Sequence, residues 1–308
     1  MKFIFMGTPE FAVPMLEKLN TLGDVDLVVS QEDKRKGRGK KLKETPVKIK
    51  AKELALEVFQ PENVNSKESV EKLKSHEPDI IVVVAYGQLL TEEILQIPKR
   101  YIINIHASLL PKLRGAAPIN RSIIEGFDKT GVSLMKVEKG LDTGAVSHVK
   151  EIEIDGMNAG ELEDKLAILG SNLLEEFIKE AEVKEIEFIP QDDSQMTYAE
   201  KINKETLNLD FNKNSKEVVN LIRGLSPKYG ARFYYKDMLY KIYDACAIEN
   251  KDDVEAGTIL KAKDELVIKT LDGAISVKEV QAPGKRAMAI SDFLRGNSFE
   301  EGYKLGGK

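Results

Sequence analysis

The sequence contains few of the residues that build disulfide frameworks and metal centres. Its 308 residues include one cysteine, three histidines and no tryptophan. The single Cys246 excludes an internal disulfide and suits a reducing cytoplasm, where disulfides are rare. The histidines and the cysteine lie far apart in sequence, so no metal-ligand spacing is present and we expect no metal.

Long apolar runs are also missing. No segment is apolar over the length that a membrane-spanning helix needs, and the first residues enter a strand pattern at once. We therefore expect a cytoplasmic protein with no signal peptide and no membrane partner, and we expect it to be a monomer. A length of 308 residues suits two domains.

Short apolar segments alternate with helical patterns in the first part of the chain. Segments 2–6, 25–29 and 101–105 read as strands, and the Ile/Val run at 79–85 is typical of a central parallel strand. This alternation predicts a doubly wound, mostly parallel α/β domain of Rossmann-like type over residues 1–189. The first turn lacks Gly-x-Gly-x-x-Gly, so a dinucleotide-binding dehydrogenase is not supported.

The second part of the chain is rich in strand patterns. Residues 190–205 are polar and weakly periodic, which predicts a linker. Residues 206–308 then form a second domain, in which Asp272-Gly273 is a strong hairpin signal. Little helix and five short strands favour a small OB-like β-barrel, with the strands expected at 232–235, 239–248, 257–260, 265–270 and 274–281.

Two polar residues at the end of the 101–105 strand, together with a carboxylate further along the chain, suit acyl chemistry. Asn104 and His106 are two residues apart, so a strand presents them on the same side. An amide can donate to a carbonyl oxygen as negative charge develops on it, and an imidazole can move protons near neutral pH. A carboxylate such as Asp142 can orient that imidazole. We predict that Asn104, His106 and Asp142 are catalytic.

This trio resembles the catalytic residues of the folate-dependent formyltransferases. The resemblance includes the neighbouring segments 108–111, 114–119 and 140–144, and it extends over residues 2–294. It implies that 10-formyltetrahydrofolate is a diffusible co-substrate. It also implies an OB-like C-terminal domain, in agreement with the strand pattern.

The segment Ser108-Leu109-Leu110-Pro111 follows the catalytic strand, where ligands bind at the edge of an open α/β sheet. Two leucines and a proline offer an apolar wall for a flat pteridine ring. The resemblance makes this segment part of the folate site. We expect Tyr86 and Gly87, after the preceding strand, to contribute to the same pocket.

A basic segment narrows the resemblance to the branch whose acceptor is methionyl initiator tRNA. Residues 34–43 carry seven positive charges and no negative one, although the chain has a net charge of −5. The segments 6–11, 36–42 and 282–288 are similar to that branch. We expect a flexible loop that contacts the tRNA acceptor stem through Arg38, which aligns with the key arginine of the family, and through Lys36, Lys40, Lys41 and Lys43.

Two other functions stay open on the sequence alone. Another folate-dependent formyltransferase, acting on an amino sugar-nucleotide or a purine precursor, would share Asn104, His106 and Asp142. The basic segment and the β-rich second domain argue against it. A non-catalytic RNA-binding protein has no use for the three catalytic residues, which argues against that reading.

Overall fold

The chain passes back and forth between two structural units. The computed structural model describes residues 1–36 and 41–306, with the side chains of 35, 36 and 41 excepted. Unlike the contiguous domains expected from sequence, the second unit includes two segments from the first half of the chain. Unit 1 is Met1–Gly115, Thr130–Ile152 and Glu163–Tyr198, and unit 2 is Ala116–Lys129, Glu153–Leu162 and Ala199–Lys308.

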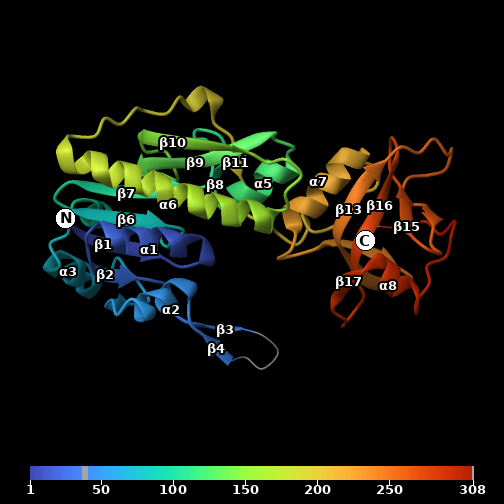
Figure 1. The fold of residues 1–308 in the computed structure, drawn as a ribbon, viewed down its shortest axis with the longest axis horizontal. Helices are drawn as coiled ribbons and strands as arrows, with labels where there is room; N and C mark the ends of the chain where they lie inside the picture. The colour runs from blue at the N-terminus through green and yellow to red at the C-terminus, as the bar shows by residue number, and fades with distance from the viewer. Residues whose placement is uncertain (37–40, 307–308) are drawn as a thin grey trace. The chain divides into compact units, whose positions relative to one another are not determined.

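A seven-stranded sheet is the centre of unit 1 (Figure 1). Its strands, in spatial order, are β10 (Val146–Glu153), β9 (Lys129–Lys136), β7 (Tyr101–His106), β6 (Ile80–Val84), β1 (Lys2–Gly7), β2 (Asp24–Val29) and β5 (Val58–Phe59). The pairs from β7 to β5 are parallel, and β9 joins β7 antiparallel. This confirms the expected mostly parallel α/β sheet. The antiparallel strand β9 was not expected, because polar residues interrupt its apolar pattern.

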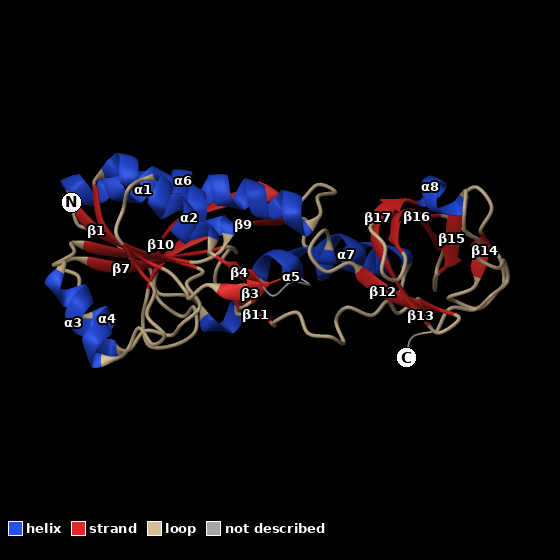
Figure 2. Ribbon diagram, turned by 90° about the horizontal axis from the view of Figure 1, so that it is seen from below, coloured by secondary structure: helices blue, strands red, loops and turns tan. Residues whose placement is uncertain are grey.

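Helices cover both faces of this sheet. Figure 2 shows α1 and α6 on one face and α3 and α4 on the other. Buried side chains of β1, β2, β6 and β7 share one apolar cluster with those of α3 and α4. The helices of unit 1 are η1 (Glu10–Ala12), α1 (Val13–Leu22), α2 (Pro46–Glu53), α3 (Lys67–Ser75), α4 (Glu92–Leu95), most of α6 (Ala159–Val183) and η2 (Asp193–Gln195).

The two described ends of the basic segment are paired strands, and residues 37–40, within the loop that we expected to be flexible, lie outside the described residues. These ends form an antiparallel hairpin of β3 (Lys34–Lys36) and β4 (Lys41–Lys43). Lys48 of α2 holds the base of both arms, because its ammonium lies 2.6 Å from Asp33 Oδ2 and 3.4 Å from Glu44 Oε1. These ion pairs align the two arms so that their backbones can pair.

An antiparallel sheet forms the centre of unit 2, as the strand pattern predicted. Its spatial order is β12 (Ala231–Tyr235), β13 (Met238–Ile248), β16 (Ala274–Gln281), β15 (Leu266–Lys269) and β14 (Ile259–Lys261), and β17 (Ala287–Ala289) also pairs with β16. The helices are α5 (Pro118–Ile124), α7 (Ser215–Leu225) and α8 (Ile290–Leu294). A short pair, β8 (Arg114–Gly115) and β11 (Tyr198–Ala199), lies where the chain changes units.

The end of the described chain joins the two edges of the unit 2 sheet. Thr258 beside β14 bridges to Lys304, and Tyr234 of β12 bridges to Gly306. The Leu305 side chain between these bridges is 4% exposed and belongs to the apolar core of the unit. This segment therefore connects β14 to β12 and turns the open sheet toward a barrel, although the sequence showed no strand pattern there.

The helices of the described part of the chain are all too short or too polar to cross a bilayer.

We predict that Leu305→Ala lowers the free energy of unfolding by about 2–4 kcal/mol, because it leaves a cavity in the core of unit 2. The control is Lys304→Ala, which removes only an exposed ion pair with Glu255 and should change the stability little. Urea unfolding followed by circular dichroism measures both. Equal losses in the two variants would show that the segment is held by its backbone pairing alone.

Candidate active site

Strand β7 carries Asn104 and His106 on the face of the sheet that α3 and α4 cover. Ile102 belongs to the apolar cluster on that face, and alternation puts positions 104 and 106 on the same side. Among the described residues, the Asn104 side chain has no hydrogen-bond partner, and it is half-buried. Its amide hydrogens are therefore available to a ligand at the carboxyl edge of the sheet.

Both nitrogens of the His106 ring face oxygen atoms. Nε2 lies 2.9 Å from the Leu113 carbonyl oxygen, and Nδ1 lies 3.7 Å from Asp142 Oδ2. A carbonyl only accepts hydrogen bonds, so Nε2 carries the proton of the first contact. In the neutral ring, Nδ1 is then the proton acceptor. The Asp142 carboxylate faces this nitrogen.

The position of Asp142 is set by a backbone hydrogen bond to its carboxylate and by its own backbone conformation. Its Oδ2 accepts a hydrogen bond of 2.8 Å from the Gly115 N–H, and its own backbone is left-handed, with φ +55°. Such a conformation is uncommon outside glycine and recurs at functional sites. Two residues later, a Cβ on Gly144 would lie 1.9 Å from the Lys136 carbonyl oxygen, so only glycine fits.

One glutamine connects the Asp142 turn to the rest of the site. Gln191 Nε2 donates to the carbonyl oxygens of Asp142 (2.9 Å) and Gly144 (2.8 Å). Gln191 Oε1 accepts from Nε and Nη2 of Arg114, at 2.9 and 2.7 Å. Arg114 is 3% exposed, and its Nη2 also pairs with Asp193. A buried guanidinium with these partners gives the glutamine one defined orientation.

Residues 191–198 therefore belong to the frame of the site and are not part of a simple linker as we expected for 190–205. Besides Gln191, Thr197 accepts hydrogen bonds of 2.9 Å at its hydroxyl from the Leu113 N–H and at its carbonyl from the Arg114 N–H. Sequence reasoning missed Gln191 and Thr197, because a polar segment without periodicity reads as a linker. It also missed Leu113, because only the backbone of that residue takes part.

The segment expected to bind folate is a braced turn beside β7. Ser133 Oγ of β9 accepts from the Leu110 N–H (3.1 Å) and donates to the Ser108 carbonyl (2.7 Å). The Ser108 hydroxyl is itself buried and donates to the Lys112 carbonyl, so it is not free to bind a ligand. Leu109, Leu110 and Pro111 are half-buried and supply the apolar surface that a flat ring needs.

Tyr86 and Gly87 lie at the end of β6, next to β7 in the sheet. The Tyr86 side chain is 1% exposed and lies in the α3/α4 apolar cluster, and burial raises the pKa of its hydroxyl to about 12. Any contact of Tyr86 with folate therefore has to come from its backbone. Gly87 is exposed, and its φ of +95° is one that glycine adopts without strain.

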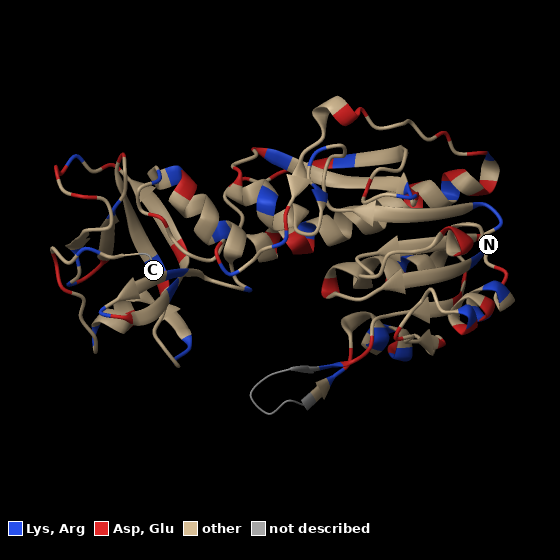
Figure 3. Ribbon diagram, turned by 180° about the vertical axis from the view of Figure 1, so that it is seen from behind, with Lys and Arg blue, Asp and Glu red and all other residues tan. Residues whose placement is uncertain are grey.

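The basic residues expected to bind tRNA are only partly described. Arg38 and Lys40 lie outside the described residues. The backbones of Lys36 and Lys41 pair with each other in the hairpin, and the Lys43 side chain is exposed. Figure 3 shows basic and acidic residues side by side at the base of β3 and β4. Asp33 and Glu44 at this base are both paired with Lys48 of α2, as described above.

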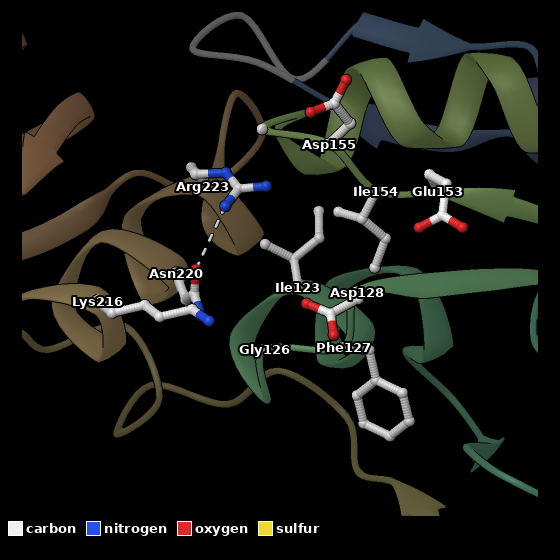
Figure 4. A pocket seen from close by; sticks show the side chains of 11 residues that line it. Ile123, Gly126, Phe127, Asp128, Glu153, Ile154, Asp155, Lys216, Asn220 and Arg223 are labelled. Carbon is white, nitrogen blue, oxygen red and sulfur yellow. Dashed lines mark hydrogen bonds between the residues drawn. The ribbon is translucent and has the colours of Figure 1, made fainter.

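Unit 2 contains a separate cavity of about 400 Å³ (Figure 4). The Arg223 guanidinium in its wall donates to the Met157 carbonyl and to Asn220 Oδ1, and burial lowers its pKa. None of the predicted catalytic residues lines this cavity, and its charges are mixed. The lining residues are Ile123, Gly126, Phe127, Asp128, Glu153, Ile154, Asp155, Gly156, Lys216, Asn220 and Arg223.

Metal ligands are not grouped in residues 1–36 and 41–306: no three His, Cys, Asp or Glu side chains there could hold an ion together. The site is thus one carboxamide, one imidazole and one carboxylate beside an apolar turn. This arrangement can stabilise an oxyanion and accept a proton.

Comparison with known proteins gives matches over both parts of the chain. Two protein families match, Formyl transferase over residues 1–178 and Formyl transferase, C-terminal domain, over residues 201–298. The methionyl-tRNA formyltransferase of Caldanaerobacter subterraneus subsp. tengcongensis is 45% identical over 310 residues, covering 99% of this chain and 100% of that protein. The methionyl-tRNA formyltransferase of Clostridioides difficile is 42% identical over 309 residues, with the same coverage.

A solved structure has a similar fold at low identity. It is an N-formyltransferase from Helicobacter canadensis in complex with folinic acid and dTDP-3-aminofucose. The TM-score is 0.68 at 19% identity, covering 90% of this chain and 98% of that chain.

We predict that Gln191→Leu loosens the Asp142 turn. The substitution removes the donor to two carbonyls and one of the two partners of the buried Arg114 guanidinium, which should cost about 1–3 kcal/mol of stability. Amide hydrogen exchange should become faster in residues 138–144 and at Gly115. The control is Gln195→Leu, because the exposed Gln195 side chain bonds only Asp192. Unchanged exchange in the Gln191 variant would show that the turn is held without it.

Proposed function

Because the chain belongs to the formyl transferase family and is similar over nearly its whole length to methionyl-tRNA formyltransferases, we propose that it transfers the formyl group of 10-formyltetrahydrofolate to the α-amino group of methionyl initiator tRNA. The observation that carries the proposal is the free Asn104 carboxamide on the same strand as the His106–Asp142 pair. The protein acts in the cytoplasm, as a monomer and without a metal.

In the reaction, the neutral amine attacks the formyl carbon and the carbonyl oxygen becomes negative. The Asn104 amide donates to that oxygen. The bond from carbon to the folate nitrogen then breaks. The amine loses one proton and the leaving nitrogen gains one, so no covalent bond to the enzyme is needed.

His106 is the proton carrier in this scheme. Its Nε2 proton is engaged by the Leu113 carbonyl, which leaves oxyanion donation to Asn104. Nδ1 takes the proton of the attacking amine, and the Asp142 carboxylate 3.7 Å away stabilises the charge that forms. The 3.7 Å separation exceeds a direct hydrogen bond, so it can close as the ring becomes charged.

The folate is proposed to bind against Leu109, Leu110 and Pro111, with the backbone of Ser108 and of the Tyr86–Gly87 turn beside it. The half-buried apolar side chains of the turn and its bracing by Ser133 support this. The folinic acid in the Helicobacter canadensis enzyme supports a folate donor for this fold.

The acceptor stem is proposed to contact the β3–β4 hairpin. Lys36, Arg38, Lys40, Lys41 and Lys43 would neutralise phosphates there, and the salt bridges of Lys48 support a hairpin with a fixed base. The β-barrel of unit 2 would add affinity for the RNA and no chemistry.

The test is transfer of a labelled formyl group from 10-formyltetrahydrofolate to three acceptors: methionyl initiator tRNA, methionyl elongator tRNA and an amino sugar-nucleotide. We expect rapid transfer to the initiator tRNA alone. Asn104→Ala should lower that kcat by about 10²–10³-fold, because one oxyanion donor is lost. Preferred transfer to the sugar would replace the proposal by the other formyltransferase function, and no transfer at all would leave a binding protein.

Arg38 is expected to discriminate between tRNAs. Phosphate contacts do not depend on sequence, whereas a planar guanidinium can reach a base edge or an unpaired end in a way that an ammonium cannot. Arg38→Lys should therefore lower kcat/KM strongly for initiator tRNA and little for elongator tRNA. Lys40→Ala and Lys41→Ala should weaken both in a salt-dependent way. Equal, salt-dependent losses in Arg38→Lys would make Arg38 one more phosphate contact.

A further inference from the structure

Gln31, just after β2, has a buried amide nitrogen without a partner. Nε2 has almost no exposed surface, and no hydrogen-bond acceptor lies within reach of it among the described residues. The backbone of the same residue is satisfied: its carbonyl accepts from Gln60 Nε2 at 2.6 Å. A buried donor left unpaired costs about 1–3 kcal/mol, so it calls for a functional explanation.

The position of Gln31 relates it to the catalytic strand. Leu27 and Val29 of β2 lie in the α3/α4 apolar cluster, and alternation continued to position 31 keeps the same face. Asn104 and His106 lie on that face of β7. All three side chains are thus at the carboxyl edge of one sheet and on one side of it.

The neighbours of the amide show which way it points. A Cβ added to Gly87 would lie 3.9 Å from both Cγ and Nε2 of Gln31, in ordinary contact. Gly87 follows β6, the strand between β1 and β7, so the Gln31 side chain extends from β2 toward the catalytic strand. The Thr8 hydroxyl nearby is already used, because it donates to the Tyr86 carbonyl at 2.8 Å. No protein group described there completes the amide.

The apolar turn and Gln31 lie on different sides of β7. The apolar Ser108–Pro111 turn is braced against β9, on one side of β7. Gln31 approaches from the other side, and the basic hairpin begins three residues later at Lys34. Gln31 therefore lies between the start of the hairpin and the Gly87 turn next to the catalytic strand. Neighbouring strands are about 4.8 Å apart, so the Gln31 amide lies at least one strand spacing from the formyl carbon that reacts beside Asn104.

We propose that Gln31 is a substrate-positioning residue whose Nε2 donates a hydrogen bond to an oxygen of the terminal nucleotide of the charged tRNA. The inference rests on the proposed function and names a contact within it. Gln31 takes no part in bond making: it aligns the nucleotide that carries the amine. An uncharged donor next to the hairpin supplies direction, whereas the lysines and arginines supply attraction.

The test is Gln31→Met, which keeps the length of the side chain and removes its polar atoms. We expect kcat/KM for methionyl initiator tRNA to fall about 3–10-fold, the size of one hydrogen bond, mainly through KM. The KM for 10-formyltetrahydrofolate should not change. The fall should be equal at low and high salt, since a neutral amide releases no counterions.

A stability measurement distinguishes a substrate-positioning role of Gln31 from a structural one. Gln31→Met should leave the urea midpoint unchanged or raise it, because it removes an unsatisfied donor. The matched control is Gln88→Met. The Gln88 amide accepts from the Val64 N–H at 2.9 Å and donates to the Glu62 carbonyl at 3.2 Å, so its loss should lower the midpoint.

Three results would overturn the proposal: an unchanged kcat/KM for the tRNA, a penalty that depends on salt, or a midpoint lowered as far as in Gln88→Met. If the wild-type protein formylates a different acceptor, the proposed function fails. The same comparison on that acceptor then decides whether Gln31 positions it.

Discussion

The carboxamide of Gln191 is the contact on which the geometry of the site depends. It donates to the two carbonyls of the Asp142 turn and accepts the fork of the buried Arg114. Arg114 lies directly before Gly115, whose N–H holds the Asp142 carboxylate. Gln191 therefore holds both the turn that carries Asp142 and the segment whose N–H binds the Asp142 carboxylate. Because a buried guanidinium has to be paired, the chain cannot relax this arrangement without a large loss of stability.

A second constraint comes from the sheet itself. Parallel strands end at one edge, and alternate residues share one face. Asn104 and His106 reach that edge from β7, and Gln31 reaches it after β2, with β6 and β1 between them. The apolar turn after β7 occupies one side, and the strands leading to the basic hairpin occupy the other. On the proposed function, a folate at the apolar turn and an acceptor from the hairpin side would meet at the Asn104 amide.

Much of this arrangement could be predicted from sequence, because the signals were local. The Ile/Val runs gave the central parallel strands, and a spacing of two put Asn104 and His106 on one face. Strand β9 was missed because its threonine, glycine, serine and lysine residues hide the apolar alternation. Gln191 was missed for a different reason: its partners Arg114 and Asp142 lie 77 and 49 residues away, and no local pattern marks such a contact. The same holds for the segment around Leu305, which joins two strands distant in sequence.

In the segment from Gln31 to Lys43, the residues that would attract an RNA differ from the residue that would orient it. Positive charge attracts every RNA in a similar way, because phosphate contacts are independent of sequence. A net charge of −5 over the whole chain limits that attraction to places where basic residues are concentrated, and the hairpin is such a place. At its base, Asp33 and Glu44 each form an ion pair with Lys48 of α2, so these two carboxylates are already neutralised. Two residues before Asp33, the unpaired amide of Gln31 carries no charge and points toward the catalytic strand. On the proposed function, the basic strands β3 and β4 would hold an RNA loosely, and its end would be oriented only where it reaches this amide. Binding strength and correct placement would then come from different residues of one short segment.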